Sequence, residues 1–344
     1  MVRFQQILVN WYEQNKRDLP WRHTNNPYLI WLSEIILQQT RVDQGISYYC
    51  KFIKEFPTVL DLANAEERQV LNLWQGLGYY SRARNLHVAA KSILNDYHGK
   101  FPNSFSEILK LKGIGNYTAS AISSFAFNEP KAVLDGNVFR VLSRLFAIET
   151  PIDSSEGQKQ FQEIANELLD KSNPGIYNQA IMEFGALQCV PMNPNCSICP
   201  LVAMCEANAH NKIKSLPFKK GKTKISNRYF VFEIIKTKYG KFLLEQRKEK
   251  GIWHNLFQFP LKEFQNSNEK ELYLSTEKFN HISKEFKHIL SHQHLFCTFA
   301  FKEDFGDEIE NLNIAVSLEE LDNYPIPRVI EKFIEENANL LFVK

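Results

Sequence analysis

The order of hydrophobic and polar residues predicts helices along residues 1–211. Apolar side chains recur there three or four positions apart, so they would line one face of a helix. One such stripe consists of Val138, Val141, Leu142 and Leu145. The alternation of apolar and polar residues that is typical of strands is scarce in this part of the chain. We therefore expect residues 1–211 to form an all-helical domain.

The last part of the chain, residues 229–344, has a different pattern. Runs of β-branched and aromatic residues bounded by turn residues predict strands over 228–236, 240–247 and 294–301. A helical pattern returns at 327–336. We expect a second domain of mixed α and β structure.

A basic segment, residues 212–228, separates these two patterns. It contains seven Lys and Arg residues, no acidic residue, and proline, glycine and serine, so it predicts an interdomain linker. The net charge is −1 upstream of this segment and −4 downstream of it. If the protein binds a polyanion, it must therefore use local clusters and backbone amides rather than a positive field over the whole surface.

The length of 344 residues and the 44% hydrophobic content allow two or three domains with sizeable cores. The first residues contain no uninterrupted apolar segment followed by a small-residue cleavage site. No later stretch reaches 18 apolar residues. We expect a cytoplasmic protein with no membrane segment.

Four of the six cysteines lie within 17 residues of one another and predict a metal site. They are Cys189, Cys196, Cys199 and Cys205. Four cysteines in one compact loop favour a cubic iron-sulfur cluster, and zinc remains the alternative. A disulfide-bonded loop would need an oxidising compartment, and we see no signal that directs the chain to one.

Residues 106–125 predict two helices joined by a hairpin at Gly113 and Gly115. Glycines permit positive φ and a close approach of the backbone. The hairpin would leave amide N–H groups at a helix N-terminus, where they could bind a phosphate oxygen. A plain helix-helix turn is the alternative interpretation.

Two carboxylates complete a possible catalytic set. Asp135 follows Gly115 by twenty residues and has the pattern of a helix N-cap, where amides and the helix dipole favour its ionised form. Glu34 has bulky apolar neighbours on both sides, so burial would raise its pKa and make it a general acid. This division of roles suits chemistry at a glycosidic bond, although Glu34 could also be structural.

The hairpin, the aspartate that follows it and the cysteine loop resemble the helix-hairpin-helix DNA glycosylases of the endonuclease III superfamily. The resemblance spans most of residues 1–211. Five further motifs resemble the adenine DNA glycosylase, or MutY, branch: Leu19–Arg22, Trp31–Glu34, Leu37–Thr40, Gly76–His87 and Leu134–Val138. The resemblance implies a six-helix barrel and an iron-sulfur lobe, in which the four cysteines hold one 4Fe-4S cluster.

The resemblance also implies a mechanism in which adenine is flipped out of the duplex. Glu34 would protonate the purine at N7 and later activate water, and Asp135 would stabilise the oxocarbenium sugar. Tyr117 and Asn137 would position these groups. Bifunctional relatives carry a lysine nucleophile at the position of Tyr117, so we expect base excision without efficient strand cleavage.

Other motif positions correspond to binding residues of the family. The adenine pocket would be lined by Trp21, Arg22, Leu37 and Val42, and each of these could equally be a core residue. Gln39 and Tyr79 match positions that wedge into the duplex, the alternative for Tyr79 being a packed aromatic. DNA phosphates would be contacted by Lys112, Gly113 and Gly115.

Residues 229–344 resemble the MutT-like, or Nudix-like, domain of the same family through Phe242–Arg247 and Gly251–Pro260. A Nudix hydrolase needs a metal-binding box of the form R-E-x-x-E-E, which residues 261–272 lack. We therefore expect recognition of an oxidised base without nucleotide hydrolysis. Ser291 and His292 match a loop that reads 8-oxoguanine, although relatives often have phenylalanine in place of Leu290.

We therefore expect a monomeric, monofunctional glycosylase that acts in base excision repair. It would bind double-stranded DNA, associate with the nucleoid, and remove adenine paired with 8-oxoguanine or guanine. One alternative is a bifunctional glycosylase-lyase, which Tyr117 disfavours. The other is a non-catalytic DNA-damage binding protein, which the intact Glu34 and Asp135 disfavour.

Overall fold

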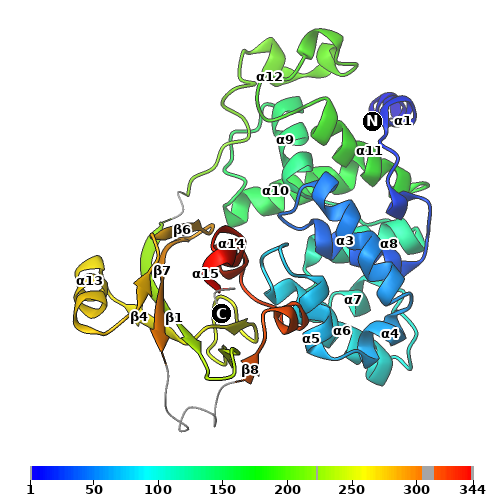
Figure 1. The fold of residues 1–344 in the computed structure, drawn as a ribbon. Coiled ribbons are helices and arrows are strands. Elements are labelled where there is room, and N and C mark those ends of the chain that lie inside the picture. Colours follow the sequence, from blue (N-terminus) through cyan, green and yellow to red (C-terminus); the bar gives the residue numbers. More distant parts are fainter. Residues whose placement is uncertain (1, 222–223, 304–313, 342–344) are drawn as a thin grey trace. The chain divides into compact units, whose positions relative to one another are not determined.

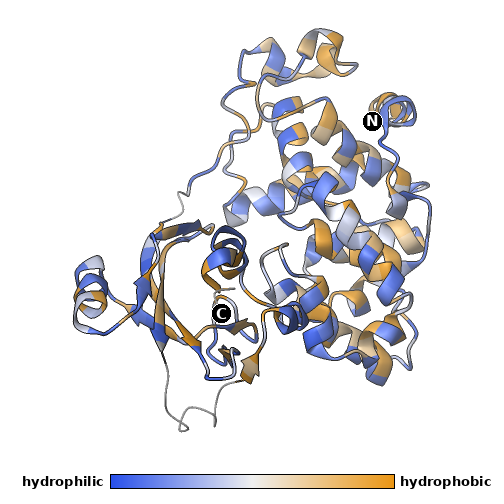
Figure 2. Ribbon diagram, in the orientation of Figure 1, coloured by the Kyte–Doolittle hydropathy of each residue, from blue (hydrophilic) through white to orange (hydrophobic). Residues whose placement is uncertain are grey.

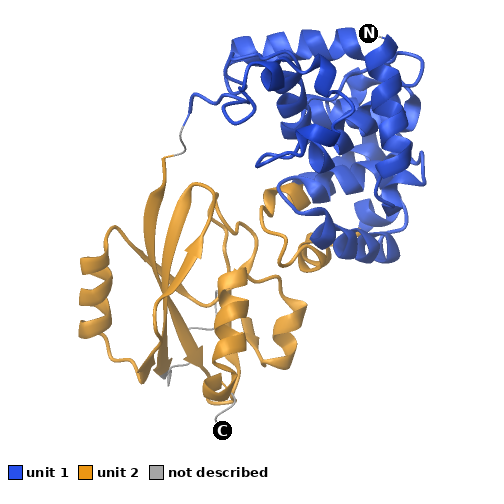
Figure 3. Cartoon of the chain, turned by 90° about the horizontal axis from the view of Figure 1, so that it is seen from above, with its two compact units in different colours: residues 1–64, 85–221 blue, residues 65–84, 222–344 orange. Residues whose placement is uncertain are grey.

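The computed structural model describes residues 2–221, 224–303 and 314–341. Its internal contacts divide the chain into two compact units, shown in two colours in Figure 3. The first unit comprises residues 1–64 and 85–221, and the second comprises residues 65–84 and 222–344. Residues 65–84, which the sequence analysis assigned to the helical domain, thus fall with the C-terminal residues.

The first unit contains only helices among its described residues, in agreement with the expected all-helical domain (Figure 1). Its α-helices are α1 (Val2–Asn15), α2 (Pro27–Leu37), α3 (Val42–Glu55), α4 (Val59–Asn64), α6 (Ser81–Asp96, which begins in the second unit), α7 (Phe105–Ile108), α8 (Asn116–Phe127), α9 (Gly136–Leu145), α10 (Ser155–Leu168), α11 (Pro174–Leu187) and α12 (Glu206–Ala209). Three short 3-10 helices are η1 (Pro20–Arg22), η2 (Cys196–Ile198) and η3 (Val202–Met204).

One hydrophobic core of this unit forms where α1, α9, α10 and α11 pack together. The apolar stripe expected from the sequence is buried: Val138, Val141, Leu142 and Leu145 all belong to one hydrophobic cluster. Figure 2 shows the same mixture of hydrophilic and hydrophobic residues along most helices of the unit. Burial of this stripe holds α9 against the neighbouring helices. It thereby fixes the position of Asp135, the residue directly before the helix.

The second unit is built around one mixed sheet, which confirms the expected α and β domain (Figure 1). Its strands are β1 (Ser226–Lys236), β2 (Phe242–Gln246), β3 (Phe257–Gln258), β4 (Leu261–Phe264), β5 (His281–Ile282), β6 (Phe286–Ile289), β7 (Gln293–Glu303) and β8 (Ile314–Val316). Its helices are α5 (Glu67–Leu73), α13 (Ser267–Thr276), η5 (Glu319–Asn323), α14 (Arg328–Glu336) and α15 (Ala338–Leu341).

The parallel pair β1 and β7 forms the centre of this sheet, and the other strand pairs are antiparallel. Phe232 lies opposite Phe299 in the register of β1 and β7, and their rings stack at 5.0 Å. Phe333 of α14 stacks on Phe299 at 3.9 Å. Aromatic stacking therefore joins the sheet to the helix that the sequence predicted at 327–336.

The basic segment 212–228 is divided between the two units. Leu216 is buried, and Asp153 accepts hydrogen bonds from the backbone amides of Lys220 and Gly221, so residues 212–221 pack on the helical unit. Ser226 already begins β1. Residues 222–223 of the segment, like 304–313 and 342–344 of the second unit, lie outside the described residues.

In the described part of the chain, we find no helix that combines the length and the apolar character needed to cross a membrane.

Candidate active site

A cavity of about 490 Å³ lies within the helical unit and gathers predicted residues from distant parts of the sequence. Nine of them line it: Trp21, Arg22, Glu34, Leu37, Gln39, Val42, Tyr117, Asp135 and Asn137. These side chains come from η1, α2, the turn after α2, the start of α3, α8, and the N-cap and first turn of α9. The four expected pocket residues thus line this cavity, and each keeps a partly exposed surface rather than joining the core.

Glu34 lies near the C-terminal end of α2 and is only 7% exposed. Helix α2 begins with Pro27 after the capping residue Asn26, and it buries every side chain from Ile30 to Ile36, which brings Glu34 inside with them. The Tyr117 hydroxyl donates a hydrogen bond of 2.7 Å to Oε2 of Glu34. Burial raises the pKa of Glu34 to about 7, against the opposing effect of this hydrogen bond. The side chain can therefore carry a proton near neutral pH.

Asp135 is the N-cap of α9, as the sequence predicted. Its Oδ1 accepts hydrogen bonds from the backbone amides of Asn137 at 2.9 Å and Val138 at 2.7 Å. Its Oδ2 accepts one from Asn137 Nδ2 at 2.8 Å. All three donors are N–H groups, which favour the ionised carboxylate, while burial acts against them and raises the pKa of Asp135 above its ordinary value.

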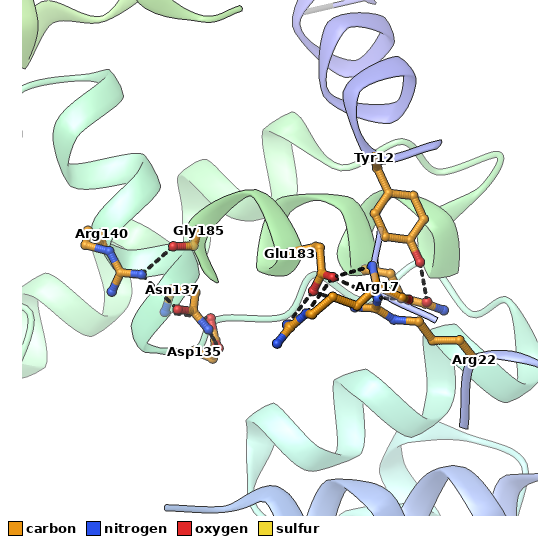
Figure 4. Close-up of polar contacts among 9 residues, drawn as sticks. Tyr12, Arg17, Arg22, Asp135, Asn137, Arg140, Glu183 and Gly185 are labelled. Carbon is orange, nitrogen blue, oxygen red and sulfur yellow. Dashed lines mark hydrogen bonds and ion pairs between the residues drawn. The ribbon is translucent and has the colours of Figure 1, made fainter. Parts of the chain in front are cut away.

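Arg140 fixes the orientation of the Asn137 amide. Its Nη2 donates to Asn137 Oδ1 at 2.8 Å and to the Gly185 carbonyl at 2.6 Å (Figure 4). Because Asn137 Oδ1 accepts from Arg140, Nδ2 of the same amide is the group that faces Asp135. The position of the carboxylate therefore depends on an arginine one turn further along α9.

The same helix face reaches the cysteine loop. Arg140 Nε donates to the Cys189 carbonyl at 2.7 Å. Arg144, which is 2% exposed, donates to the carbonyls of Val190 at 2.8 Å and Pro191 at 2.9 Å. Arg144 Nη1 also lies 3.5 Å from Cys189 Sγ. Helix α9 thus carries the Asp135 cap at one end and holds the cysteine loop at the other.

The four clustered cysteines are free thiols with partly exposed side chains. Burial, together with the charges of the other three thiols, raises the pKa of Cys199 to about 11. Within the described ranges, no three His, Cys, Asp or Glu side chains are arranged to hold a single metal ion. Four cysteine sulfurs from one loop are a donor set that is consistent with an iron-sulfur cluster.

Two residues of the cavity, Glu183 and Arg17, were missed by the sequence analysis. Glu183 on α11 is 1% exposed and accepts hydrogen bonds from the guanidinium groups of Arg17 and Arg22 at 2.7 to 3.0 Å (Figure 4). Burial acts to raise its pKa, but the two arginines outweigh burial and lower the pKa of Glu183 to about 2. The available signal was a single acidic residue in the apolar run 180–187, the same signal that singled out Glu34.

The predicted phosphate-binding hairpin joins α7 and α8. Gly113 has a φ of +80°, and a Cβ atom there would lie 2.6 Å from the Cβ of Asn85, so glycine is required. Gly115 has a φ of −102° and is the N-cap of α8, so of the two glycines Gly113 is the one that adopts a positive φ. Since Gly115 has no side chain to cap the helix, the first amides of α8 are open to an anion. Lys112 directly precedes the hairpin and is exposed.

Tyr79 and Ser291 lie together in the second unit. Tyr79 is 47% exposed and has a φ of +48°, directly after the positive-φ glycines Gly76 and Gly78, as expected for a side chain that is not part of the core. Its hydroxyl makes a hydrogen bond with Ser291 Oγ. Ser291 and His292 are both exposed on the turn between β6 and β7, where the Leu290 amide donates to the Gln293 carbonyl at 2.8 Å.

In the described part of the second unit, we find no group of side chains that could hold the metal ion of a Nudix hydrolase. Residues 265–270 read Gln-Asn-Ser-Asn-Glu-Lys, and Lys270 on α13 is only 1% exposed. Its ammonium group forms an ion pair with Glu285 and lies 3.4 Å from Thr298 Oγ1. The ammonium of Lys270 thus neutralises the Glu285 carboxylate, which makes this carboxylate a poorer ligand for a divalent cation.

Two family models match separate parts of the chain. Residues 32–167 match the HhH-GPD superfamily of base excision DNA repair proteins. Residues 230–336 match the NUDIX domain.

Individual relatives extend the similarity over nearly the whole chain. The chain is 41% identical over 296 residues to the adenine DNA glycosylase of Buchnera aphidicola subsp. Baizongia pistaciae, covering 85% of this chain and 84% of the relative. It is 35% identical to the enzyme of that name from Buchnera aphidicola subsp. Acyrthosiphon pisum, over 98% of this chain and 99% of the relative. Among solved structures, a thermostable thymine-DNA glycosylase matches 60% of this chain and 95% of its own, with a TM-score of 0.56 and 29% identity.

Proposed function

This chain belongs to the adenine DNA glycosylase family, and from that premise we propose that it excises adenine paired with 8-oxoguanine or guanine. Its reaction is hydrolysis of the N-glycosidic bond in base excision DNA repair. The observation that carries the proposed mechanism is that Glu34 and Asp135 line one cavity in different hydrogen-bonding environments. One of these carboxyl groups can be protonated at neutral pH while N–H donors stabilise the ionised form of the other.

Adenine enters the cavity after it is flipped out of the duplex, because its glycosidic bond cannot be reached inside the base stack. Tyr117 donates to Oε2 of Glu34, which leaves the other oxygen to carry the proton that is delivered to adenine N7. Protonation makes adenine a better leaving group, and the bond to the sugar breaks.

Asp135 then faces the positive charge that develops on the sugar. Asn137 and the amides at the start of α9 keep the carboxylate in place while the oxocarbenium ion forms. Glu34 has lost its proton and can take one from water, which attacks the sugar and completes hydrolysis. Tyr117 offers no amine for a Schiff base, so we assign the chain a monofunctional reaction.

We assign recognition of the base that is paired with adenine to the second unit. Ser291 and His292 are exposed on one turn, and the Ser291 hydroxyl lies against the exposed Tyr79. The polar groups that would recognise the partner base therefore lie beside the aromatic side chain that would insert into the duplex. An aromatic side chain can occupy the space that the flipped adenine leaves. Gln39 is exposed with a φ of +57° at the rim of the catalytic cavity and is assigned the second wedge position.

We assign one 4Fe-4S cluster to Cys189, Cys196, Cys199 and Cys205. When bound, the cluster would hold the loop in shape, and its thiolate ligands would carry the negative charge that Arg140 and Arg144 face. The proposed partner is double-stranded DNA, bound by a monomer in the cytoplasm at the nucleoid. The open amides of α8 and the exposed Lys112 support a phosphate contact at the hairpin.

Single-turnover excision tests this proposal. Duplexes with adenine opposite 8-oxoguanine, guanine or thymine are incubated with the protein and analysed with and without hot alkali. We expect cleavage of the adenine strand for the first two duplexes, and only after alkali. Cleavage without alkali would contradict the monofunctional assignment, and equal excision opposite thymine would contradict the assigned mismatch preference.

Two isosteric variants test the catalytic roles. Glu34→Gln and Asp135→Asn should each abolish excision while mismatch binding stays within a few-fold of wild type. Ser291→Ala and His292→Ala should lower the preference for 8-oxoguanine over guanine. Normal turnover by either carboxylate variant would remove that residue from the mechanism.

A further inference from the structure

The turn Trp253–Asn255 has an unusual backbone. Trp253 and Asn255 have φ values of +60° and +64°, a region that is uncommon for a bulky aromatic residue. The indole of Trp253 is held by ring contacts to Phe230, Phe232 and His288. Non-glycine residues persist in this conformation only where the surroundings enforce it, and they concentrate at functional clamps and binding sites.

This turn presents two polar groups to residues 65–84. The His254 carbonyl accepts a hydrogen bond from Arg84 Nη1 at 2.7 Å. The side-chain amide of Asn255 donates to Glu67 Oε1 at 2.6 Å. Glu67 and Arg84 stand near opposite ends of the segment, so a single turn fastens both ends.

The middle of the segment is held at a second place in the same unit. The Ile326 amide donates to Gln75 Oε1 at 3.3 Å, and the Tyr80 hydroxyl donates to the Ile326 carbonyl at 3.4 Å. Tyr79, next to Tyr80, contacts Ser291. The segment that carries the wedge is therefore attached to the sheet unit on both sides of Tyr79.

The turn that carries Tyr79 is also stabilised by contacts among its own residues. Trp74 Nε1 donates to the Gly78 carbonyl at 3.0 Å, and the Arg82 guanidinium lies over the rings of Trp74 at 5.0 Å and Tyr79 at 5.6 Å. Arg82 Nη2 donates to the Gly78 carbonyl at 3.2 Å. These contacts make the turn rigid. The hydrogen bonds near the two ends of residues 65–84 therefore fix the position of Tyr79.

We propose that the turn Trp253–Asn255 is an intramolecular clamp for residues 65–84, and that it sets the preference for the oxidised partner base by holding Tyr79 against Ser291. Residues Gly251–Pro260 resemble a motif of the Nudix-like family. In this chain the motif serves as the clamp, a role that requires no metal ion. Glu67 and Asn255 are positioning residues, because they lie in neither the catalytic cavity nor the Ser291 turn. The specificity part of this inference rests on the proposed function, whereas the clamp itself does not.

The test uses the full-length protein with single variants of the clamp. Asn255→Gly removes the amide and keeps the freedom to adopt a positive φ, so it adds no backbone strain. Glu67→Ala removes the acceptor, and Glu67→Gln retains an acceptor oxygen as a conservative control. Asn211→Gly is a matched control, since Asn211 also has a positive φ, of +56°, and lies in the other unit.

Two measurements are made on each variant. Hydrogen exchange of peptides spanning 74–84 should quicken about 10-fold in Asn255→Gly and Glu67→Ala, the effect of losing one hydrogen bond to a charged group. The ratio of single-turnover rates opposite 8-oxoguanine and guanine should fall several-fold in the same two variants. The double variant should resemble either single variant, because both changes break one contact.

Unchanged exchange in both variants would overturn the clamp. Faster exchange with an unchanged rate ratio would overturn its role in specificity. If the wild type excises adenine opposite neither base, the proposed function and the specificity role fall together, and exchange alone still decides whether the clamp exists. Should Asn255→Gly fail to fold, the comparison of Glu67→Ala with Glu67→Gln decides the same question.

Discussion

The hydroxyl of Tyr117 donates a 2.7 Å hydrogen bond to Glu34, although the two residues are 83 positions apart in the sequence. One lies on α8 and the other on α2, and both face the cavity that contains Asp135. This contact determines which Glu34 oxygen is free to hold a proton. It also opposes the effect of burial on the pKa of Glu34.

The excision rate should depend on pH through Glu34. Its pKa is raised to about 7, and a general acid must be protonated, so the rate should fall as pH rises above about 7. A single-turnover pH profile on adenine opposite 8-oxoguanine measures this. A rate that keeps rising through pH 9 would contradict the assigned role.

Glu34 should also make the fold less stable as pH rises. Its pKa in the folded state, about 7, exceeds its ordinary value of 4.5, so the folded state binds more protons between these limits and loses stability across them. We expect Glu34→Gln to exceed wild type in unfolding free energy by about 3 kcal/mol more at pH 8 than at pH 4. Urea denaturation at both pH values checks this, and a pH-independent difference would exclude the linkage.

Removing the phenol should shift the pH profile. Tyr117→Phe deletes the hydrogen bond that lowers the pKa of Glu34, so the alkaline limb should move to higher pH. The maximal rate should fall about 10-fold, because the carboxyl group loses the partner that positions it. If only the maximal rate changes and the alkaline limb stays at the same pH, this limb does not reflect the ionisation of Glu34.

The Glu183 carboxylate should increase the unfolding free energy of the protein. It joins Arg17 and Arg22 with side-chain exposure of 1%, so Glu183→Ala leaves two guanidinium groups without their shared carboxylate. We expect a loss on the order of 3 kcal/mol in unfolding free energy at pH 7. Its pKa is lowered to about 2, so this contribution is present above pH 4.5 and is lost as pH falls toward 2. Equal losses at pH 7 and pH 2.5 in urea titrations would contradict this.

Arg140 should support catalysis through Asn137. Arg140→Lys cannot reproduce donation to Asn137, Gly185 and Cys189 together, because lysine lacks the planar fork of donors. Excision should fall at least about 10-fold, while binding to the mismatched duplex persists. Full activity in this variant would show that the amide of Asn137 needs no external support.

Much of the fold and part of the site follow from short-range patterns. The apolar stripe of α9 predicts its buried face, and Asp135 caps that helix because its partners are only two and three residues away. The run around Glu34 predicts its burial because its neighbours on the same helix are apolar. The β-branched runs 228–236 and 294–301 predict the central strands for the same reason.

The remaining features depend on residues that only packing brings together. Glu183 meets Arg17 across 166 positions, and Asn255 meets Glu67 across 188. The sequence by itself determined the helical character of residues 1–211, the strands β1, β2 and β7 and the local cap of Asp135, since these follow from neighbouring residues and from periodicity. Only the tertiary structure decided that residues 65–84 pack with the sheet unit and that Tyr117 faces Glu34, because such contacts arise from how whole elements fit against one another.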